Sequence, residues 1–235
     1  MPKGVLYLIP VPLAEQAADR SVTPLHHRLI NVLKAYIVEN EKTARHWLKA
    51  MDFTVAQSDL TLYSYGKHAD KTQLSGYFKE LERGEDVGLM SEAGCPAIAD
   101  PGSEIVAEAH RRGIKVVPLV GPSSILLALM ASGFNGQSFI FHGYLPIDKA
   151  QRTKVIRDLE SNSVRLNQTQ IFIETPFRNN QMLDELLRTC KPQTRLCVAW
   201  NLTGEDEHIV SDTIAGWKHK KADLHKQAAI FLLYR

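Results

Sequence analysis

Small and polar residues follow two short apolar runs of this chain, at the point where each run ends. Val87–Met90 is followed by Ser91–Gly94, and Lys115–Val120 is followed by Gly121–Ser124. Each run is typical of a buried strand, and a helix is expected soon after each small-residue segment. Such residues let a ligand approach the backbone, and helix N-termini supply N–H groups. Since the carboxyl ends of parallel strands share one sheet edge, the pattern indicates a ligand site there, although ordinary tight turns have the same composition.

Charged side chains follow other predicted strands. Glu39 and Glu174 each end an apolar stretch, and Arg45 and Arg178 follow them within a few residues. Lys226 precedes the apolar stretch that ends the chain. A carboxylate or cation at a strand end is suited to orient a polar acceptor or to take its proton. A helix cap with a solvated ion pair explains the same pattern, so both interpretations stay open.

The composition argues against several kinds of site. The chain has three cysteines and no Cys-x-x-Cys pair, so we expect neither a disulfide framework nor a metal site. The histidines are scattered, and we expect four of them at the surface: His26, His27, His219 and His225. The formal net charge of +2 neither requires nor excludes a nucleic-acid partner. The longest apolar helix candidate, Ile125–Ala131, is too short to cross a bilayer, and we expect a cytoplasmic protein with no membrane partner.

The elements that must position these residues alternate in the N-terminal half. Strands are predicted at Val5–Ile9, Tyr36–Glu39, Leu60–Tyr63, Val87–Met90 and Lys115–Val120, with helices at Leu25–Lys34, Thr43–Met51 and Lys71–Arg83. Such alternation favours a mostly parallel sheet with helices on its faces. Asp100 and Pro101 are predicted to cap and begin the next helix.

Strands follow one another more directly in the C-terminal half, which favours a mixed sheet. They are predicted at Phe139–Tyr144, Gln170–Glu174, Arg195–Trp200, His208–Asp212 and Ala228–Leu233, with helices at Lys149–Asn162 and Asn179–Thr189. The sequence therefore predicts two α/β domains, residues 1–119 and residues 120–235.

Several of these segments, in this order, resemble the tetrapyrrole methylase superfamily. The resemblance is carried by Ser91–Pro96, Asp100–Gly102 and Val117–Ser124, and it extends from Gly4–Pro10 through Phe139–Pro146 to Ala199–Thr203. The most similar branch is the ribosomal small-subunit cytidine-2′-O-methyltransferases. The resemblance implies a methyltransferase with S-adenosylmethionine in a cleft between two α/β domains, and it implies a homodimer.

The resemblance also implies roles for individual residues. Donor-binding positions are expected at Pro10, Glu92, Ala93, Gly94, Gly121, Ser123, Ser124, Ile173, Leu202, Ala228 and Ala229. Glu39, Glu174 and Lys226 are the candidate catalytic residues, and Arg45 and Arg178 are expected to contact the acceptor. No metal is needed, because a sulfonium donor carries its own activation and the protein has to align the reactants.

The chain departs from that branch at several positions. Pro10–Leu13 replaces Pro-Ile-Gly-Asn-Leu, Phe177 replaces a histidine, and Trp200-Asn201 replaces Arg-Glu. We expect the small additional C-terminal domain of this branch to be lacking, because the sequence stops after the last predicted strand.

The favoured acceptor is a ribose 2′-hydroxyl of small-subunit rRNA. Six basic residues either surround it or belong to solvated helix surface, and the solvated surface is favoured for those between 149 and 157: Arg45, Lys149, Arg152, Lys154, Arg157 and Arg178. The alternatives are methylation of a small molecule such as a tetrapyrrole, and a module that binds the donor without transferring its methyl group.

Overall fold

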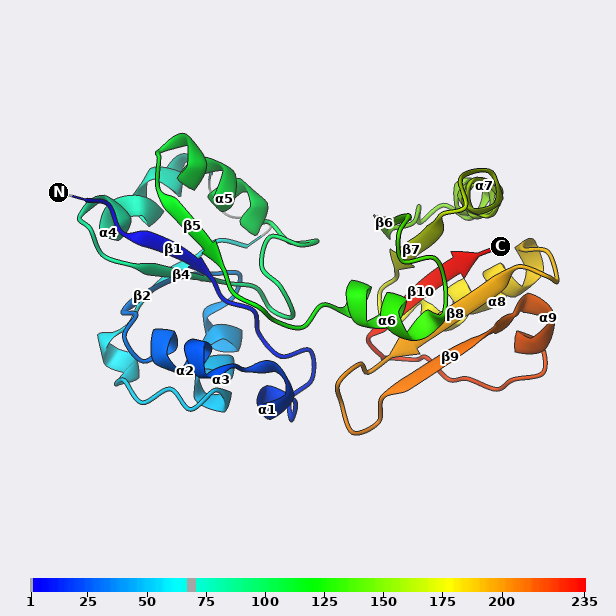
Figure 1. Ribbon diagram of the computed structural model, residues 1–235, viewed down its shortest axis with the longest axis horizontal. Helices are drawn as coiled ribbons and strands as arrows, with labels where there is room; N and C mark the ends of the chain where they lie inside the picture. The colour runs from blue at the N-terminus through cyan, green and yellow to red at the C-terminus, as the bar shows by residue number, and fades with distance from the viewer. Residues whose placement is uncertain (1, 67–70) are drawn as a thin grey trace. The chain divides into compact units, whose positions relative to one another are not determined.

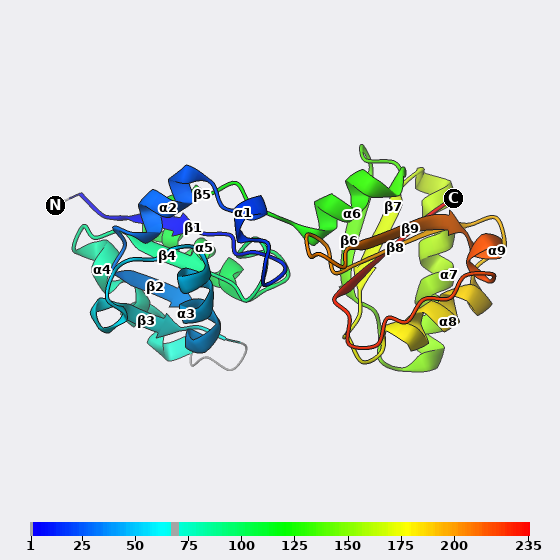
Figure 2. The same ribbon diagram turned by 90° about the horizontal axis from the view of Figure 1, so that it is seen from below.

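The computed structural model describes residues 2–66 and 71–235, which form two compact units, Met1–Ser123 and Ser124–Arg235. Each unit contains its own sheet with helices on both faces (Figures 1 and 2). The two α/β architectures predicted from the sequence are therefore confirmed, the first parallel and the second mixed.

The N-terminal sheet has the strand order β3-β2-β4-β1-β5, with every pairing parallel. Its strands are β1 (Val5–Leu8), β2 (Ala35–Val38), β3 (Thr61–Ser64), β4 (Val87–Met90) and β5 (Lys115–Pro118). The connecting helices are α1 (Ala18–Ser21), α2 (Pro24–Ile30), α3 (Glu41–Ala50), α4 (Lys79–Glu82) and α5 (Gly102–Arg111), with short 3₁₀ segments η1 (Gln57–Asp59) and η2 (Lys71–Phe78). The central strands β2 and β4 are buried at every position, as strands covered on both faces must be.

Two separate cores lie on the two faces of this sheet. Leu81 of α4 and Ile105 of α5 pack against Leu6 and Leu89 on one face. On the other face, side chains of α2 and α3 pack against Ile9 and Tyr36. Figure 1 shows the corresponding arrangement, with α4 and α5 on one side of the strands and α2 and α3 on the other.

The C-terminal sheet has the order β6-β7-β10-β8-β9, in which β6 and β7 are parallel and the other pairs antiparallel. Its strands are β6 (Phe139–Tyr144), β7 (Thr169–Ile173), β8 (Arg195–Trp200), β9 (His208–Thr213) and β10 (Ala229–Tyr234). The helices are α6 (Ser124–Ser132), α7 (Lys149–Leu166), α8 (Asn179–Thr189) and α9 (Ile214–Trp217). The core between α7, α8, α9 and the sheet includes Ile156, Leu186, Trp217, Phe172 and Phe231.

Three local expectations were wrong. The stretch Lys71–Arg83 is not one helix, since 3₁₀ turns occupy η2 before the short α4. Helix α5 begins at Gly102 and not at the predicted Pro101. Asp100 lies outside the helix, and its carboxylate accepts a hydrogen bond of 2.7 Å from the Gly102 amide. His26 is 1% exposed, since its Nδ1 lies 2.8 Å from the Thr23 hydroxyl oxygen in the cap of α2. Burial, followed by the charge of His27, lowers the pKa of His26.

Among the described residues, no helix combines the length and apolar character needed to cross a membrane.

Candidate functional site

Four predicted segments of the N-terminal unit meet at one edge of its sheet. Strands β1, β2, β4 and β5 run in parallel and in register, so the segments that follow them leave the sheet at the same edge. These segments contain Pro10, Glu39, Ser91–Gly94 and Gly121. The parallel topology therefore brings together residues that are far apart in the sequence, as the strand order implied.

The loop after β1 is joined to the loop after β4 by backbone hydrogen bonds. The Val11 amide donates to the Gly94 carbonyl at 3.0 Å, and the Gly94 amide donates to the Val11 carbonyl at 3.1 Å. Gly94 has a φ of 71°, a conformation that disfavours any side chain. A Cβ atom at this position would lie 3.2 Å from Cδ2 of Leu13 and 3.4 Å from the Pro122 carbonyl oxygen, so the glycine lets these loops pack closely.

Gly121 has a packing reason of its own. A Cβ atom at this position would lie 2.1 Å from Cβ of Pro10, so only glycine lets these two loops touch. The Cys95 thiol donates to the Pro122 carbonyl at 3.3 Å, and burial raises the pKa of this thiol. The contacts of Gly121 and Cys95 therefore hold the loops of β1, β4 and β5 against one another.

Glu92 is held through its main chain while its side chain is exposed. Its amide donates to Oε2 of Glu39 at 2.9 Å, and its carbonyl accepts from Nε1 of Trp47 at 3.0 Å. Ala93, the next residue, is also exposed, and its carbonyl accepts from the Ser91 hydroxyl at 3.1 Å. Glu39 thus positions the loop after β4, a contact that the sequence did not reveal.

The loop before α5 contains strained backbone that the sequence analysis missed. Ala97 and Ala99 have φ values of 69° and 62°, which are unusual for residues with a side chain. The Asp100 carboxylate supports this loop by accepting hydrogen bonds from the Ala97 and Gly102 amides, at 2.9 Å and 2.7 Å. Burial nevertheless raises the pKa of Asp100, because it outweighs these two hydrogen bonds. Strain of this kind clusters at ligand sites.

A second set of predicted residues meets at one end of the C-terminal sheet. Ile173 pairs with Ile230, and Trp200 pairs with Ala229, so β7 and β8 end where β10 begins. The segments beyond these ends are joined directly. The Asn201 amide donates to the Ala228 carbonyl at 3.0 Å, and Nδ2 of Asn179 donates to the Gln227 carbonyl at 2.7 Å.

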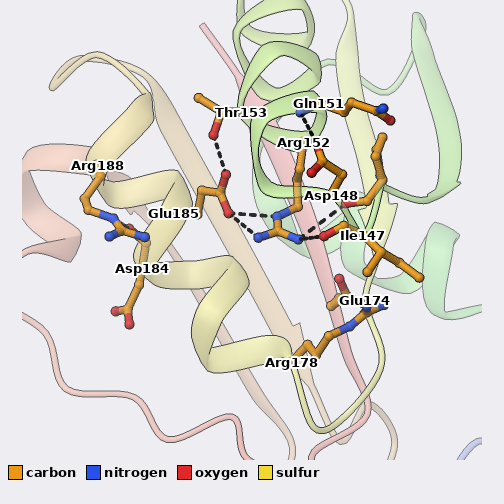
Figure 3. Close-up of polar contacts among 11 residues, drawn as sticks. Ile147, Asp148, Gln151, Arg152, Thr153, Glu174, Arg178, Asp184, Glu185 and Arg188 are labelled. Atoms are coloured by element: carbon orange, nitrogen blue, oxygen red, sulfur yellow. Dashed lines mark hydrogen bonds and ion pairs between the residues drawn. The ribbon is translucent and has the colours of Figure 1, made fainter.

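Glu174 and Arg178 form an ion pair at this end (Figure 3). Nη2 of Arg178 lies 2.6 Å from Oε1 of Glu174, and the Thr175 amide donates to the same oxygen at 2.6 Å. The Glu174 side chain is 1% exposed, whereas that of Arg178 is 27% exposed. This geometry suits Glu174 to orienting Arg178 and the loop. Its predicted catalytic role stays a prediction.

Phe177 and His225 form an exposed aromatic pair beside that ion pair. Their ring centroids are 6.0 Å apart in an edge-to-face arrangement, and Phe177 is 67% exposed. Lys226, also exposed, has a φ of 62°, and its amide donates to the Pro176 carbonyl at 3.0 Å. Position 177, where the similar branch has histidine, therefore lies next to His225 in space. Sequence spacing could not reveal this neighbour.

The remaining predicted positions differ in accessibility. Pro10, Leu202 and Ala229 are buried, Arg45, Ser123, Ser124 and Ile173 are half-buried, and Ala228 is exposed. Their roles in binding stay predictions. The favoured interpretation of Arg152 as solvated helix surface was wrong, because this residue is 9% exposed and its Nη2 lies 2.6 Å from Oε2 of Glu185 (Figure 3).

No group of three or more His, Cys, Asp or Glu residues within the described ranges is arranged to hold a metal ion.

Comparisons with known proteins agree on the family. The model of the Tetrapyrrole (Corrin/Porphyrin) Methylases matches residues 11–216. Two similar proteins are both named Ribosomal RNA small subunit methyltransferase I. The one from Halalkalibacterium halodurans is 33% identical over 79% of this chain and 60% of its own length. The one from Bacillus subtilis is 30% identical over 92% of this chain and 71% of its own length.

Two solved structures share the fold at low sequence identity. The methyltransferase CobJ aligns with a TM-score of 0.65 at 16% identity, covering 99% of this chain and 94% of its own. Cobalt precorrin-4 methyltransferase CbiF aligns with a TM-score of 0.61 at 14% identity, covering 97% and 94%. The match over residues 11–216 places this chain in the tetrapyrrole methylase family of methyltransferases.

Proposed function

We propose that this chain transfers a methyl group from S-adenosylmethionine to a ribose 2′-hydroxyl of small-subunit rRNA. The main support for this acceptor is the similarity to ribosomal RNA small subunit methyltransferase I. The similarity to the Bacillus subtilis protein of that name covers 92% of this chain. The chain spans 60% to 78% of the length of the first relatives. The reaction for which those longer proteins are named is therefore proposed for this chain.

The loops of the N-terminal unit fit such a donor. A nucleoside with an amino-acid tail needs close approach to backbone, hydrogen-bonding groups and an apolar contact. Ala93, an exposed residue with a short side chain, provides the first, and the exposed Glu92 provides a carboxylate for hydroxyl or ammonium groups. Val120 is 83% exposed directly before Gly121 and provides an apolar side chain. Glu92, Ala93 and Val120 are the residues that we propose to hold the donor.

When bound, the sulfonium donor supplies an electrophilic methyl group and leaves as a neutral thioether. The residues of this chain then have to hold the acceptor hydroxyl in line, exclude water and receive the hydroxyl proton. We propose Glu39 and His225 as the candidates for that proton and Lys226 as a cation that polarises the acceptor hydroxyl, since Glu174 is committed to Arg178. Arg178 and Arg45 are the proposed acceptor contacts.

Glu39 offers a test of the donor loop. Glu39→Gln keeps an oxygen that accepts from the Glu92 amide, whereas Glu39→Ala removes it. Because such a bond to a charged acceptor contributes about 1.5–3 kcal/mol, we expect the alanine variant to bind S-adenosylmethionine about 10-fold more weakly in a calorimetric titration. The glutamine variant keeps a neutral acceptor and should therefore lose clearly less affinity than the alanine variant. Equal affinity of all three proteins would contradict a positioning role for Glu39.

Phe177 offers a test of the acceptor site. RNA bases splayed out of a strand stack on exposed aromatic side chains, and one such contact contributes about 1–3 kcal/mol. We expect Phe177→Ala to raise the KM for small ribosomal subunits about 10-fold without changing donor affinity. Phe139→Ala is the matched control, since Phe139 is 39% exposed and begins β6, at the opposite end of the sheet. A similar rise in both variants would contradict this role of Phe177.

The acceptor itself is tested with small ribosomal subunits from a strain that lacks this protein. Purified protein and tritiated S-adenosylmethionine should label the rRNA, and nuclease mapping should find the label on a ribose. Label confined to a small-molecule fraction would overturn the RNA acceptor. Donor binding with no transfer to any fraction would leave a binding module.

The proposed active form is a cytoplasmic homodimer. Its support is the family resemblance, together with exposed apolar side chains on the C-terminal unit: Leu126, Met130, Tyr144 and Ile147. Sedimentation equilibrium should give twice the 26.4 kDa mass of one chain. A monomer at micromolar concentration would contradict this part of the proposal.

A further inference from the structure

A pocket of about 490 Å³ lies on the C-terminal unit, away from the segments discussed so far. Its lining residues come from α7, from the C-terminal end of α8 and from the end of β10, and include Arg157, Glu160, Ser161, Arg165, Lys191 and Arg235. The strand β10 begins beside the Glu174 end of the sheet and finishes here. Its six residues span about 20 Å, so the pocket is remote from the proposed acceptor site.

Four cations surround this pocket. Arg157, Ser161 and Arg165 recur every four residues and therefore lie along one face of α7, with the two arginines about 12 Å apart along the helix axis. Lys191 follows α8, and Arg235 is tied down by a hydrogen bond of 3.0 Å from its amide to the Ser163 hydroxyl. All four cationic side chains belong to exposed residues.

The pocket has one carboxylate side chain, that of Glu160, and this side chain is hydrogen-bonded to other groups of the protein. Glu160 is 6% exposed and accepts hydrogen bonds from the Lys191 amide at 2.7 Å and from the Thr194 hydroxyl. Arg165 donates to Oδ1 of Asn162 at 2.8 Å. Within residues 2–66 and 71–235, none of the four cations forms an ion pair with a carboxylate. Four cationic side chains therefore surround a site with a single carboxylate side chain, which is bonded internally.

We propose that this pocket binds phosphate groups of an RNA backbone. Like charges held together repel one another, and an anion between them relieves that repulsion. Guanidinium groups bind phosphate oxygens through paired hydrogen bonds, and the Ser161 hydroxyl adds a further donor. The two arginines leave α7 about 12 Å apart along the helix axis, so the cationic surface is long enough to contact more than one phosphate of a chain.

This inference rests on the proposed RNA acceptor and adds a second contact to it. An rRNA segment bound at this pocket, about 20 Å from the Glu174 end of the sheet, would hold the substrate through its phosphates without contacting its bases. Such a contact is independent of sequence and depends strongly on salt.

The test compares Arg157→Gln/Arg165→Gln/Lys191→Gln with Lys34→Gln/Lys218→Gln/Lys221→Gln, a control that removes three exposed positive charges outside the pocket. Binding of the full chain to polyuridylate is measured by fluorescence anisotropy between 50 and 200 mM salt, with melting temperatures as a check on folding. We expect the pocket variant to bind at least about 10-fold more weakly at low salt. The slope of log affinity against log salt should become shallower by about 2. The control should lose clearly less.

Equal losses in the two variants, or no loss in the pocket variant, would overturn the inference. Inorganic phosphate is the other probe: if it displaces polyuridylate from the wild type at micromolar concentration, the pocket is a small-anion site and the RNA proposal is wrong. Because polyuridylate binding does not require methyl transfer, a failure of the pocket is distinguishable from a failure of the proposed rRNA methylation.

Discussion

Glu185→Ala is expected to lower the free energy of unfolding of the C-terminal unit by about 3–5 kcal/mol. The Glu185 carboxylate is 2% exposed and accepts from Nε of Arg152 at 2.7 Å and from the Thr153 hydroxyl at 2.6 Å. Its removal leaves the Arg152 guanidinium buried with no carboxylate partner, held only by backbone carbonyls such as that of Ile147 (Figure 3). Urea unfolding monitored by tryptophan fluorescence measures the change, since Trp200 and Trp217 are buried in this unit.

The neighbouring residues of α8 provide the control. Asp184→Ala removes an exposed carboxylate one position earlier, so it should change stability by no more than about 0.5 kcal/mol. In Arg152→Met/Glu185→Leu both charges are gone, and the loss should be smaller than the sum of the single losses. Additive losses would show that the pair contributes nothing as a pair.

The stability that Glu185 provides should depend on pH in one direction. Burial raises its pKa, but the hydrogen bonds from Thr153 and Arg152 outweigh burial and leave the pKa lowered. A lowered pKa means that the contribution is complete above the unfolded-state pKa of about 4.3 and is lost as the pH falls through the folded-state value. The stability difference between the wild type and Glu185→Ala should therefore be constant from about pH 6 to 7 and shrink below about pH 4.

Ala93→Trp is expected to reduce methyl transfer and donor affinity by at least about 100-fold, equivalent to about 2.7 kcal/mol of binding free energy. Ala93 is exposed on the loop after β4, beside Gly94. An indole ring there would fill the space that the proposed donor needs, while the core of the unit is untouched. Calorimetric titration with S-adenosylmethionine and transfer of a tritiated methyl group measure the two effects.

Ala56→Trp is the matched control, because Ala56 is an exposed alanine of the same unit that precedes η1. Both variants should melt within a few degrees of the wild type. Normal donor binding in a folded Ala93→Trp protein would place the donor elsewhere and would contradict the proposed use of this loop.

The positions of the candidate site residues within each sheet were largely predictable. In the N-terminal unit, Pro10, Glu39, Ala93 and Gly121 follow strands whose alternation with helices already implied parallel pairing. Parallel strands in register end at the same edge, so the sequence order of strands was enough to gather these residues.

The partners of those residues were not predictable, because they come from distant elements. The bond between Glu39 and the Glu92 amide, the packing of Gly121 on Pro10 and the contact of Phe177 with His225 each join segments that no periodicity connects. The sequence predicts Glu39 and Glu174 as candidate catalytic residues. In the structure Glu39 also holds the Glu92 amide, and Glu174 holds Arg178.

The sequence by itself determined the two α/β units, the order of their elements and the polar loops at the strand ends, because hydrophobic periodicity and turn residues are local properties. Only the tertiary structure decided which charges are buried and which face solvent. Arg152 and Arg157 lie on the same helix and looked equivalent in the sequence. α8 presents Glu185 to Arg152 and buries it, while Arg157 remains exposed at the cationic pocket. Burial of a charge depends on which neighbour packs against that face of the helix, and a single strand or helix carries no record of its neighbours.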